Sequence, residues 1–353
     1  MRAVVFQGAG EPLTIEDVPE PECPPHGIVV ETEACGICRS DWHAWQGDWD
    51  WVGVKPQPGQ IFGHEPVGIV REVGADVTRF EEGDRVTTPF NLSDGTCPHC
   101  RAGRANICEN IVPLGFVGMA QGAFAGQFAL PDADHNAVRL PDDVDPVAVA
   151  ALGCRFATAF HGLAHRVSVT AGDWVAVHGC GGVGLSAVHI AAALGATVVA
   201  VDIGDDKLDK ARELGAHETV NVADVDSVTR EIKRVTGGGA NVSVDALGIE
   251  ETCQNSVNCL VKGGQHLQIG LTTSDERGEI SLPIDAIAMG EKELYGAFGM
   301  QPNRYDEIFR MIANGSVDPG KIVSETVSLD AVPEKLAALS DYESVGIPVV
   351  NEF

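Results

Sequence analysis

The sequence predicts an α/β protein with two domains, an irregular antiparallel β-barrel and a doubly wound parallel sheet. Short β-branched runs separated by Gly and Pro fill the part of the chain before Cys154. Strands and helices alternate from Asp173 onward. The chain has 353 residues, more than the roughly 250–300 residues at which a single core stops growing. The chain is therefore long enough for both domains.

The expected strands of the first domain are residues 27–35, 67–74 and 83–90. Turn-forming residues recur between such short strands, which is typical of an irregular antiparallel barrel or sandwich. The chain shows no internal repeat and no low-complexity segment.

The second domain is predicted from the alternation of short apolar strands with helices, which indicates a parallel doubly wound sheet. The expected strands are 174–179, 197–202, 241–248 and 265–270, and the expected helices are 183–195, 206–215 and 252–261. The alternation weakens after about Glu293, and the remaining segment is too short for a third domain. We therefore expect residues 1–153 and 294–353 to form one domain and residues 154–293 the other.

The composition is strongly acidic, with a net charge of −27 and only eight lysines among 24 basic residues. Nucleic-acid binding needs a basic surface, so this class of function is excluded. The lysine-poor acidic composition resembles that of proteins from salt-loving archaea, because molar salt screens charge repulsion to a range of about 3 Å. A merely acidic mesophilic protein is the alternative.

No apolar run reaches the roughly 18 residues of a membrane span, and no signal peptide is evident at Met1. Six of the ten cysteines lie between Cys35 and Cys154, and three of these fall within twelve residues. Such clusters indicate metal sites in a reducing compartment rather than disulfides. We therefore expect a cytoplasmic protein without membrane association.

The segment "HGCGGVG" follows an expected strand and opens an expected helix. Gly179 allows a tight turn, Gly181 lets the backbone approach a pyrophosphate, and Gly184 permits close helix–strand packing. The amides of the helix N-terminus, which includes Gly182 and Val183, attract the same anion. The segment predicts a dinucleotide cofactor, against the alternative of a glycine-rich turn without a ligand.

Asp202 ends the next expected strand. Its carboxylate can accept a hydrogen bond from a ribose 2′-hydroxyl and would repel a 2′-phosphate, so NAD is favoured over NADP. NADP stays possible, because the backbone near Gly204 could admit the phosphate.

Cys38, His64 and Cys154 are candidate ligands of a catalytic zinc, which needs about three protein ligands and one open position. Singly, the two cysteines could be small buried hydrophobic residues and His64 a core histidine. Cys38 lies in "EACGICRSDWHAWQGDWDW", which also holds four of the five tryptophans.

Together, "GICRSDWH", "GHEPVGIV", "GDRV", the cysteines at 97–108, "LGC…ATA" and "GCGGVG" resemble the zinc-dependent medium-chain alcohol dehydrogenases in order and spacing. The resemblance covers nearly the whole chain. It implies a GroES-like barrel, a Rossmann domain and a catalytic zinc on Cys38, His64 and Cys154. It also implies that Glu65 approaches the metal during ligand exchange and that Asp41 orients His64.

The resemblance implies a proton path from the bound alcohol through Ser40 and the nicotinamide ribose to His43. Ser40 could instead be a helix cap, and His43 a surface residue. Trp49 and Phe90 are expected walls of a pocket for apolar or aromatic alcohols. The implied cofactor contacts also include Arg39, Thr158, Lys207, Gly270 and Leu271. A basic residue that many relatives carry in the last strand is missing, so Arg39 and the glycine loop are expected to hold the phosphates.

Cys97, Cys100 and Cys108 resemble a structural zinc lobe, in which many relatives have a further cysteine at the position of Gly103. Asp94 or His99 could complete the site, three thiolates and water could suffice, or the lobe could lack zinc.

The leading hypothesis is an NAD(P)- and zinc-dependent alcohol dehydrogenase acting on a small alcohol or aldehyde as a homodimer or homotetramer. A polyol or sugar dehydrogenase and a non-catalytic binding protein are the alternatives.

Overall fold

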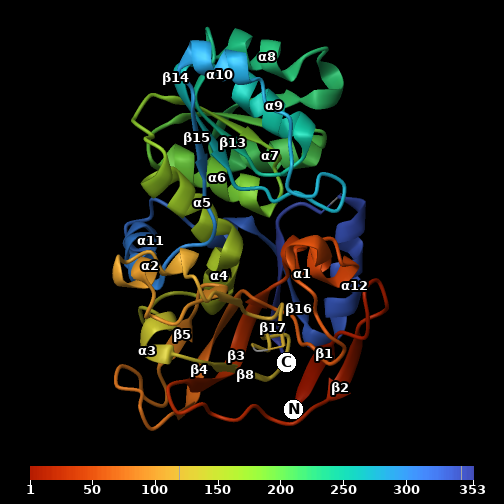
Figure 1. Ribbon diagram of the computed structural model, residues 1–353, viewed down its shortest axis with the longest axis vertical. Helices are drawn as coiled ribbons and strands as arrows, with labels where there is room; N and C mark the ends of the chain where they lie inside the picture. Colours follow the sequence, from red (N-terminus) through yellow and green to blue (C-terminus); the bar gives the residue numbers. More distant parts are fainter. Residues whose placement is uncertain (119, 343) are drawn as a thin grey trace. The chain divides into compact units, whose positions relative to one another are not determined.

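The computed structural model describes residues 1–118, 120–342 and 344–353. It divides into two compact units, Met1–Ala157 with Gly299–Phe353, and Thr158–Phe298 (Figure 1). The observed boundaries lie a few residues after the predicted ones. We describe the units one at a time.

The first unit is built around a seven-stranded sheet in the order β16-β17-β3-β4-β5-β9, with β8 also paired to β3. All described pairs are antiparallel except β16 with β17. The strands are β3 (Ile28–Gly36), β4 (Pro66–Val73), β5 (Arg85–Thr87), β8 (Gln127–Leu130), β9 (Val138–Arg139), β16 (Val323–Ser328) and β17 (Ile347–Glu352). Two small sheets pair β1 (Arg2–Val5) with β2 (Thr14–Asp17) and β6 (Asn91–Leu92) with β7 (Val112–Pro113).

The C-terminal segment of the chain belongs to this first unit. β17 pairs with β3, so that Val349 lies opposite Gly36, and Figure 1 shows the blue C-terminal strands beside the red β3. Large apolar side chains such as Phe62, Phe124 and Phe128 are almost fully buried in its core. Burial of this size is the main driving force of folding.

The helices of the first unit are short. They are α1 (Arg39–Gln46), α2 (Pro98–Arg101), α3 (Ala133–Asn136), α4 (Pro146–Ala151), α11 (Tyr305–Ala313) and α12 (Val332–Ala338). α1 has Cys38 as its N-cap, and the Asp41 side chain accepts from the backbone N–H of Cys38. Ser40 is therefore not the cap of this helix.

The second unit is a parallel six-stranded sheet in the order β12-β11-β10-β13-β14-β15, which is the strand order of Rossmann folds. Its strands are β10 (Trp174–His178), β11 (Thr197–Asp202), β12 (Ala216–Asn221), β13 (Ala240–Asp245), β14 (Leu260–Gln268) and β15 (Glu293–Gly296). Its helices are α6 (Gly182–Ala193), α7 (Asp205–Glu213), α8 (Val228–Val235), α9 (Glu250–Asn258) and α10 (Ile284–Gly290). The sequence predicted this sheet, although β12, β15, α8 and α10 were not among the expected elements.

One stretch, Pro146–Arg166, is long and apolar enough to cross a membrane by length and composition. The expectation that no apolar run has this length is therefore wrong. The stretch contains α4 and α5 (Ala157–His161), and 72% of its most apolar window is buried inside the protein. Its backbone is non-helical at Gly153. These properties match a core helix of a folded protein.

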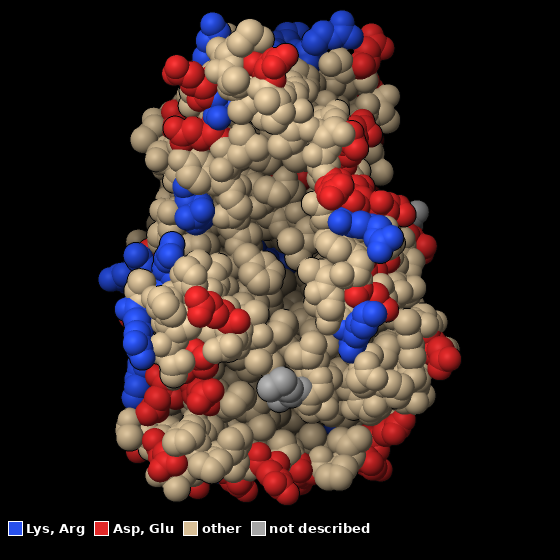
Figure 2. Space-filling model, in the orientation of Figure 1, with Lys and Arg blue, Asp and Glu red and all other residues tan. Residues whose placement is uncertain are grey.

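Acidic residues outnumber basic ones by 51 to 24. On the face shown in Figure 2, Asp and Glu gather at the end of the first unit where the N-terminus lies. An origin in high salt stays a prediction.

Candidate active site

Four potential metal ligands meet in the first unit. The ligand atoms of Cys38, His64, Glu65 and Cys154 all lie within 4.8 Å of one another. They come from three separate segments: the N-cap of α1, the loop before β4, and the turn after α4. Tertiary folding thus brings together the three predicted ligands Cys38, His64 and Cys154, which we call the ligand triad.

The geometry of the triad fits a metal ion. The two sulfur atoms are 3.5 Å apart, and His64 Nε2 lies 3.3 Å from Cys154 Sγ. His64 Nδ1 donates to Asp41 Oδ1 at 2.9 Å, which leaves Nε2 facing the thiols. Two thiolates and one imidazole form a donor set that suits zinc, with a position left open.

Asp41 orients His64 and also fixes the surrounding backbone. It is fully buried and accepts from the backbone N–H groups of Cys38 and Gly63. Carboxylates that hold the second ring nitrogen of a histidine are common around metal sites. Asp41 therefore lies at the ring nitrogen of His64 that faces away from the thiols.

Charges around the triad favour a thiolate. Burial alone raises the pKa of the Cys38 thiol, but the hydrogen bond from Cys154, the positive charge of Arg155 and His64 hold it well below its usual value. Burial also lowers the pKa of Arg155, yet Glu65 and the two thiols outweigh this and raise it, so the guanidinium stays charged. The site thus provides the ionised sulfur that metals bind.

The glycine loop of the second unit has the geometry expected of a dinucleotide site. α6 begins after Gly181. A Cβ at residue 184 would lie 1.7 Å from the Gly179 carbonyl oxygen, so only glycine fits there. A Cβ at residue 181 would meet no described atom within 4 Å, which leaves space beside the helix N-terminus for an anion.

Asp202 lies at the C-terminal end of β11, beside this loop. Its carboxylate accepts from the backbone N–H of Cys180 at 2.7 Å and from those of Ile203 and Gly204 at 2.8 and 3.0 Å. Lys207 Nζ is 3.8 Å from Asp202 Oδ1. A carboxylate has about four acceptor positions, so one remains for a ribose hydroxyl.

Comparison with known proteins identifies the family of this chain. The family described as "Alcohol dehydrogenase GroES-like domain" matches residues 24–142, and "Zinc-binding dehydrogenase" matches residues 182–314. An alcohol dehydrogenase from Moraxella sp. (strain TAE123) is 37% identical over 276 residues, which cover 78% of this chain and 79% of that protein. The chain belongs to the zinc-binding alcohol dehydrogenase family.

Solved structures of this family share the whole fold. Alcohol dehydrogenase TADH from Thermus sp. ATN1 superposes with a TM-score of 0.90 at 28% identity, with full coverage of both chains. A structure described as an NAD-dependent alcohol dehydrogenase gives a TM-score of 0.88 at 28% identity, again over 100% of both chains. The GroES-like and Rossmann folds predicted from the sequence are confirmed.

Ser40 and His43, the predicted proton path, both lie on α1 directly after Cys38. His43 Nδ1 is 2.8 Å from Asp48 Oδ2, and its ring stacks on Trp49 with centroids 5.0 Å apart. Burial outweighs Asp48 and lowers the pKa of His43. Burial thus disfavours the protonated form of His43.

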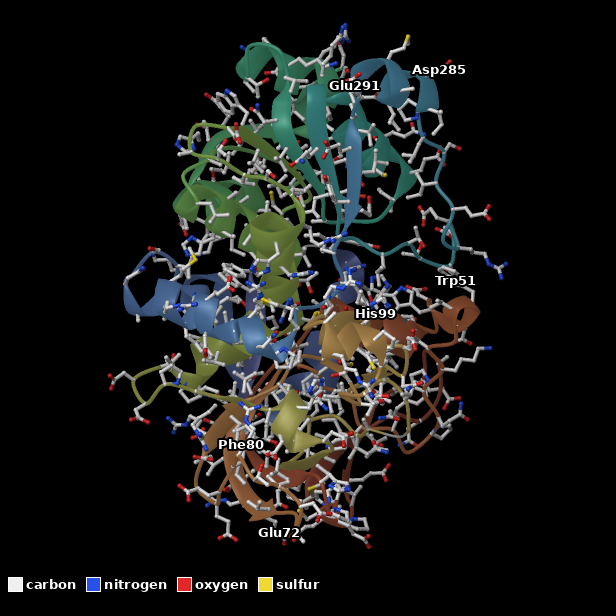
Figure 3. The ribbon with its side chains drawn as sticks, turned by 60° about the vertical axis from the view of Figure 1, so that its left-hand side comes forward. Trp51, Glu72, Phe80, His99, Asp285 and Glu291 are labelled. Carbon is white, nitrogen blue, oxygen red and sulfur yellow. The ribbon has the colours of Figure 1, made fainter. Side chains whose placement is uncertain are left out.

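The aromatic side chains around His64 include one that the sequence analysis missed. Phe90 lies edge-on to His64 at 5.9 Å, and Phe116 is closer, at 4.7 Å between centroids. Trp49 contacts Phe116 edge-on at 6.4 Å. Trp49, one expected pocket wall, thus adjoins Phe116, and Phe90, the other, contacts His64. Trp51 is exposed (Figure 3).

Arg39, the expected phosphate contact, lies against two aromatic rings. Its guanidinium lies 3.6 Å from the centroid of the Tyr342 ring and 4.6 Å from that of Trp42, and Nη1 donates to the Leu339 carbonyl at 2.6 Å. Among the described residues, its buried Nη2 has no hydrogen-bond partner. A buried donor without an acceptor is costly, and a phosphate would satisfy it.

The other predicted cofactor residues lie in the second unit. Gly270 follows β14, and its N–H donates to the Asp245 carbonyl at 2.9 Å. A Cβ at residue 270 would lie 2.3 Å from the Gly248 nitrogen, and Leu271 is half exposed. Thr158, the first residue of the unit, is buried.

The second cysteine cluster has four potential metal ligands. The ligand atoms of Asp94, Cys97, Cys100 and Cys108 lie within 4.8 Å of one another. Of the two residues that the sequence offered to complete the cluster, Asp94 is the one that lies beside the three cysteines. His99, on α2 (Figure 3), contacts Arg104 at 3.0 Å instead.

Asp94 is ionised in this arrangement. Hydrogen bonds from the Asn110 side chain and the Thr96 backbone lower its pKa from the ordinary value. A carboxylate with three thiols is a complete set of four protein ligands, as structural zinc sites require.

Proposed function

We propose that this protein oxidises primary or secondary alcohols to aldehydes or ketones with NAD(P) and a catalytic zinc. The ligand triad carries this proposal, because two buried thiols and an oriented imidazole leave one metal position for the alcohol oxygen. Cys154 supports an alcohol dehydrogenase over a polyol dehydrogenase. The resemblance implies that polyol dehydrogenases of the same superfamily often have a carboxylate in place of this third ligand.

When bound, zinc supplies Lewis acidity toward the alcohol oxygen and the nicotinamide supplies the hydride acceptor. Cys38, His64 and Cys154 would hold the metal. Asp41 keeps the proton of His64 on Nδ1, so that Nε2 can donate its lone pair. In this proposal Ser40 accepts the alcohol proton, and His43, held by Asp48, passes it toward solvent.

The proposal is tested by metal content and turnover on the same preparation. We expect purified protein to contain zinc and to reduce NAD with members of an alcohol panel, measured in molar salt. A zinc-loaded, folded protein that reduces no NAD or NADP with any alcohol would favour the non-catalytic alternative.

NAD is the preferred cofactor in this proposal, because Asp202 has one acceptor position left beside the glycine loop. We expect Asp202→Asn to lower kcat/KM for NAD about 10- to 100-fold, since a charge-assisted hydrogen bond is worth roughly 1.5–3 kcal/mol. Asp205→Asn, which changes an exposed acid at the start of α7, should leave it unchanged. Equal wild-type efficiency with NAD and NADP would contradict the role of Asp202.

A second, structural zinc is proposed on Asp94, Cys97, Cys100 and Cys108. We expect about two zinc ions per subunit in the wild type and one in Asp94→Ala, measured by elemental analysis. His99→Ala serves as the control and should keep both ions, because His99 contacts Arg104. One zinc per wild-type subunit with an intact triad would contradict this site.

We propose that the protein is a homo-oligomer. β15 is the last described strand at one side of its sheet, and Ile284, Met289 and Leu294 nearby are 65%, 76% and 42% exposed. Apolar side chains beside an open sheet edge favour association. We expect Leu294→Glu to lower the mass measured by light scattering, whereas Val52→Glu, at an exposed apolar site in the first unit, should not. A monomeric wild type would contradict the proposal.

A further inference from the structure

The residues next to the ligand triad form a buried network of their own. Ile37, Glu65 and Arg155 are each the direct chain neighbour of one triad residue. Arg155 Nη1 donates to the Ile37 carbonyl at 3.0 Å, Nε donates to Glu65 Oε1 at 3.1 Å, and Nη2 pairs with Glu65 Oε2. One guanidinium therefore links all three segments that carry the triad.

Both carboxylate oxygens of Glu65 accept hydrogen bonds. Besides its two contacts with Arg155, Oε1 accepts from the backbone N–H of Cys154 at 2.9 Å. The side chains of Arg155 and Glu65 are 7% and 0% exposed. Bidentate pairs of this kind are the strongest and most directional ion pairs in proteins.

The backbone packs closely around the Glu65 carboxylate at two glycines. A Cβ at Gly36 would lie 2.3 Å from Glu65 Oε2, and one at Gly153 would lie 2.4 Å from Glu65 Cδ. Gly153 also has a non-helical backbone, with φ 21° and ψ −137°. The turn that carries Cys154 is therefore shaped around the Glu65 carboxylate.

We propose that Arg155 is a positioning residue that cross-links the three ligand segments and, in the resting state, keeps Glu65 from becoming a fourth protein ligand. This proposal deepens the proposed function and rests on it. Glu65 lies within 4.8 Å of the triad atoms, so a free carboxylate there could reach the metal. A fourth protein ligand would close the position that a catalytic site leaves for substrate.

The test replaces the catalytic zinc by cobalt(II), whose visible spectrum reports coordination number, and compares wild type with Arg155→Gln. We expect Arg155→Gln to change the spectrum toward higher coordination as Glu65 becomes a ligand. We also expect cobalt release to a chelator to become about 10- to 100-fold faster, the usual effect of losing a residue that orients metal ligands. A merely structural role would leave the spectrum of the folded variant unchanged.

Two further variants separate the two parts of the proposal. Arg155→Gln combined with Glu65→Gln removes the carboxylate, so its spectrum should return to the wild-type form while release stays fast. Arg85→Gln is the matched control, because Arg85 makes a bidentate pair with Glu33 at 2.7 and 2.9 Å in the same unit. Its spectrum and release rate should match those of the wild type.

Arg155→Gln leaves the Glu65 carboxylate buried without its ion-pair partner, and circular dichroism shows whether this variant folds. If it does not fold, the double variant provides the test, because it has no unpaired buried charge. Wild-type spectrum and release rate in Arg155→Gln, or wild-type release in the double variant, would overturn the proposal. A wild-type chain that takes up no cobalt at the triad would overturn the proposed function, and this proposal with it.

Discussion

Cys38→Ala is expected to lose the catalytic zinc and to lower kcat for alcohol oxidation by at least about 10³-fold. The loss of the metal's charge stabilisation is worth several kcal/mol, and each 1.36 kcal/mol is about a factor of ten in rate. Cys38 Sγ lies 3.5 Å from Cys154 Sγ, so its removal leaves only two triad ligands. The measurement is zinc per subunit together with steady-state kinetics in molar salt.

Cys35→Ala is the control for this variant. Cys35 is also a fully buried thiol on β3, but its sulfur contacts the Gly36 carbonyl and lies outside both ligand clusters. We expect it to keep its zinc and its turnover. If Cys38→Ala retained the wild-type zinc content and rate, the triad would not be the catalytic centre.

Gly184→Ala is expected to destabilise the second unit by about 3 kcal/mol or more, at the upper end of the effects of overpacking. The added methyl group would lie 1.7 Å from the Gly179 carbonyl oxygen, so the turn or α6 must move. Because this displaces the loop that approaches the cofactor, NAD binding should be lost as well. Urea unfolding and NAD titration measure the two effects.

Gly181→Ala in the same loop is expected to have little effect on stability. Its methyl group would meet no described atom within 4 Å, so the free energy of unfolding should change by less than about 1 kcal/mol. NAD affinity should still fall, since the methyl group would occupy the space proposed for the pyrophosphate. Equal stability of the two variants would contradict the packing role given to Gly184.

Local patterns predicted the second unit well. β10 and β11 coincide closely with the expected strands at 174–179 and 197–202, because the 2-residue and 3.6-residue periods and the glycine loop are encoded in neighbouring residues. β12 was missed because "AHETVN" carries polar side chains that alternate irregularly, and only the adjacent β11 makes it a strand.

Side-chain partners between distant segments were harder to predict. Asp94 was one of two candidates for the second cluster, and only the fold shows that it, and not His99, lies beside Cys97, Cys100 and Cys108. Arg155 was missed as well, although a charged residue inside the apolar run at 146–166 is a signal of a buried partner. That partner, Glu65, lies 90 residues earlier in the chain.

The sequence by itself determined the two fold types and the glycine loop, which depend on residue type and short-range spacing. The residues of the ligand triad were named from the resemblance of the sequence motifs to a known family. Only the tertiary structure decided which side chains meet: the Arg155–Glu65 pair between the ligand segments, the Asp94 ligand, and the Asp48 partner of His43. Such contacts depend on how β3, the loop before β4 and the turn after α4 come together, and that arrangement is set by the packing of the whole core.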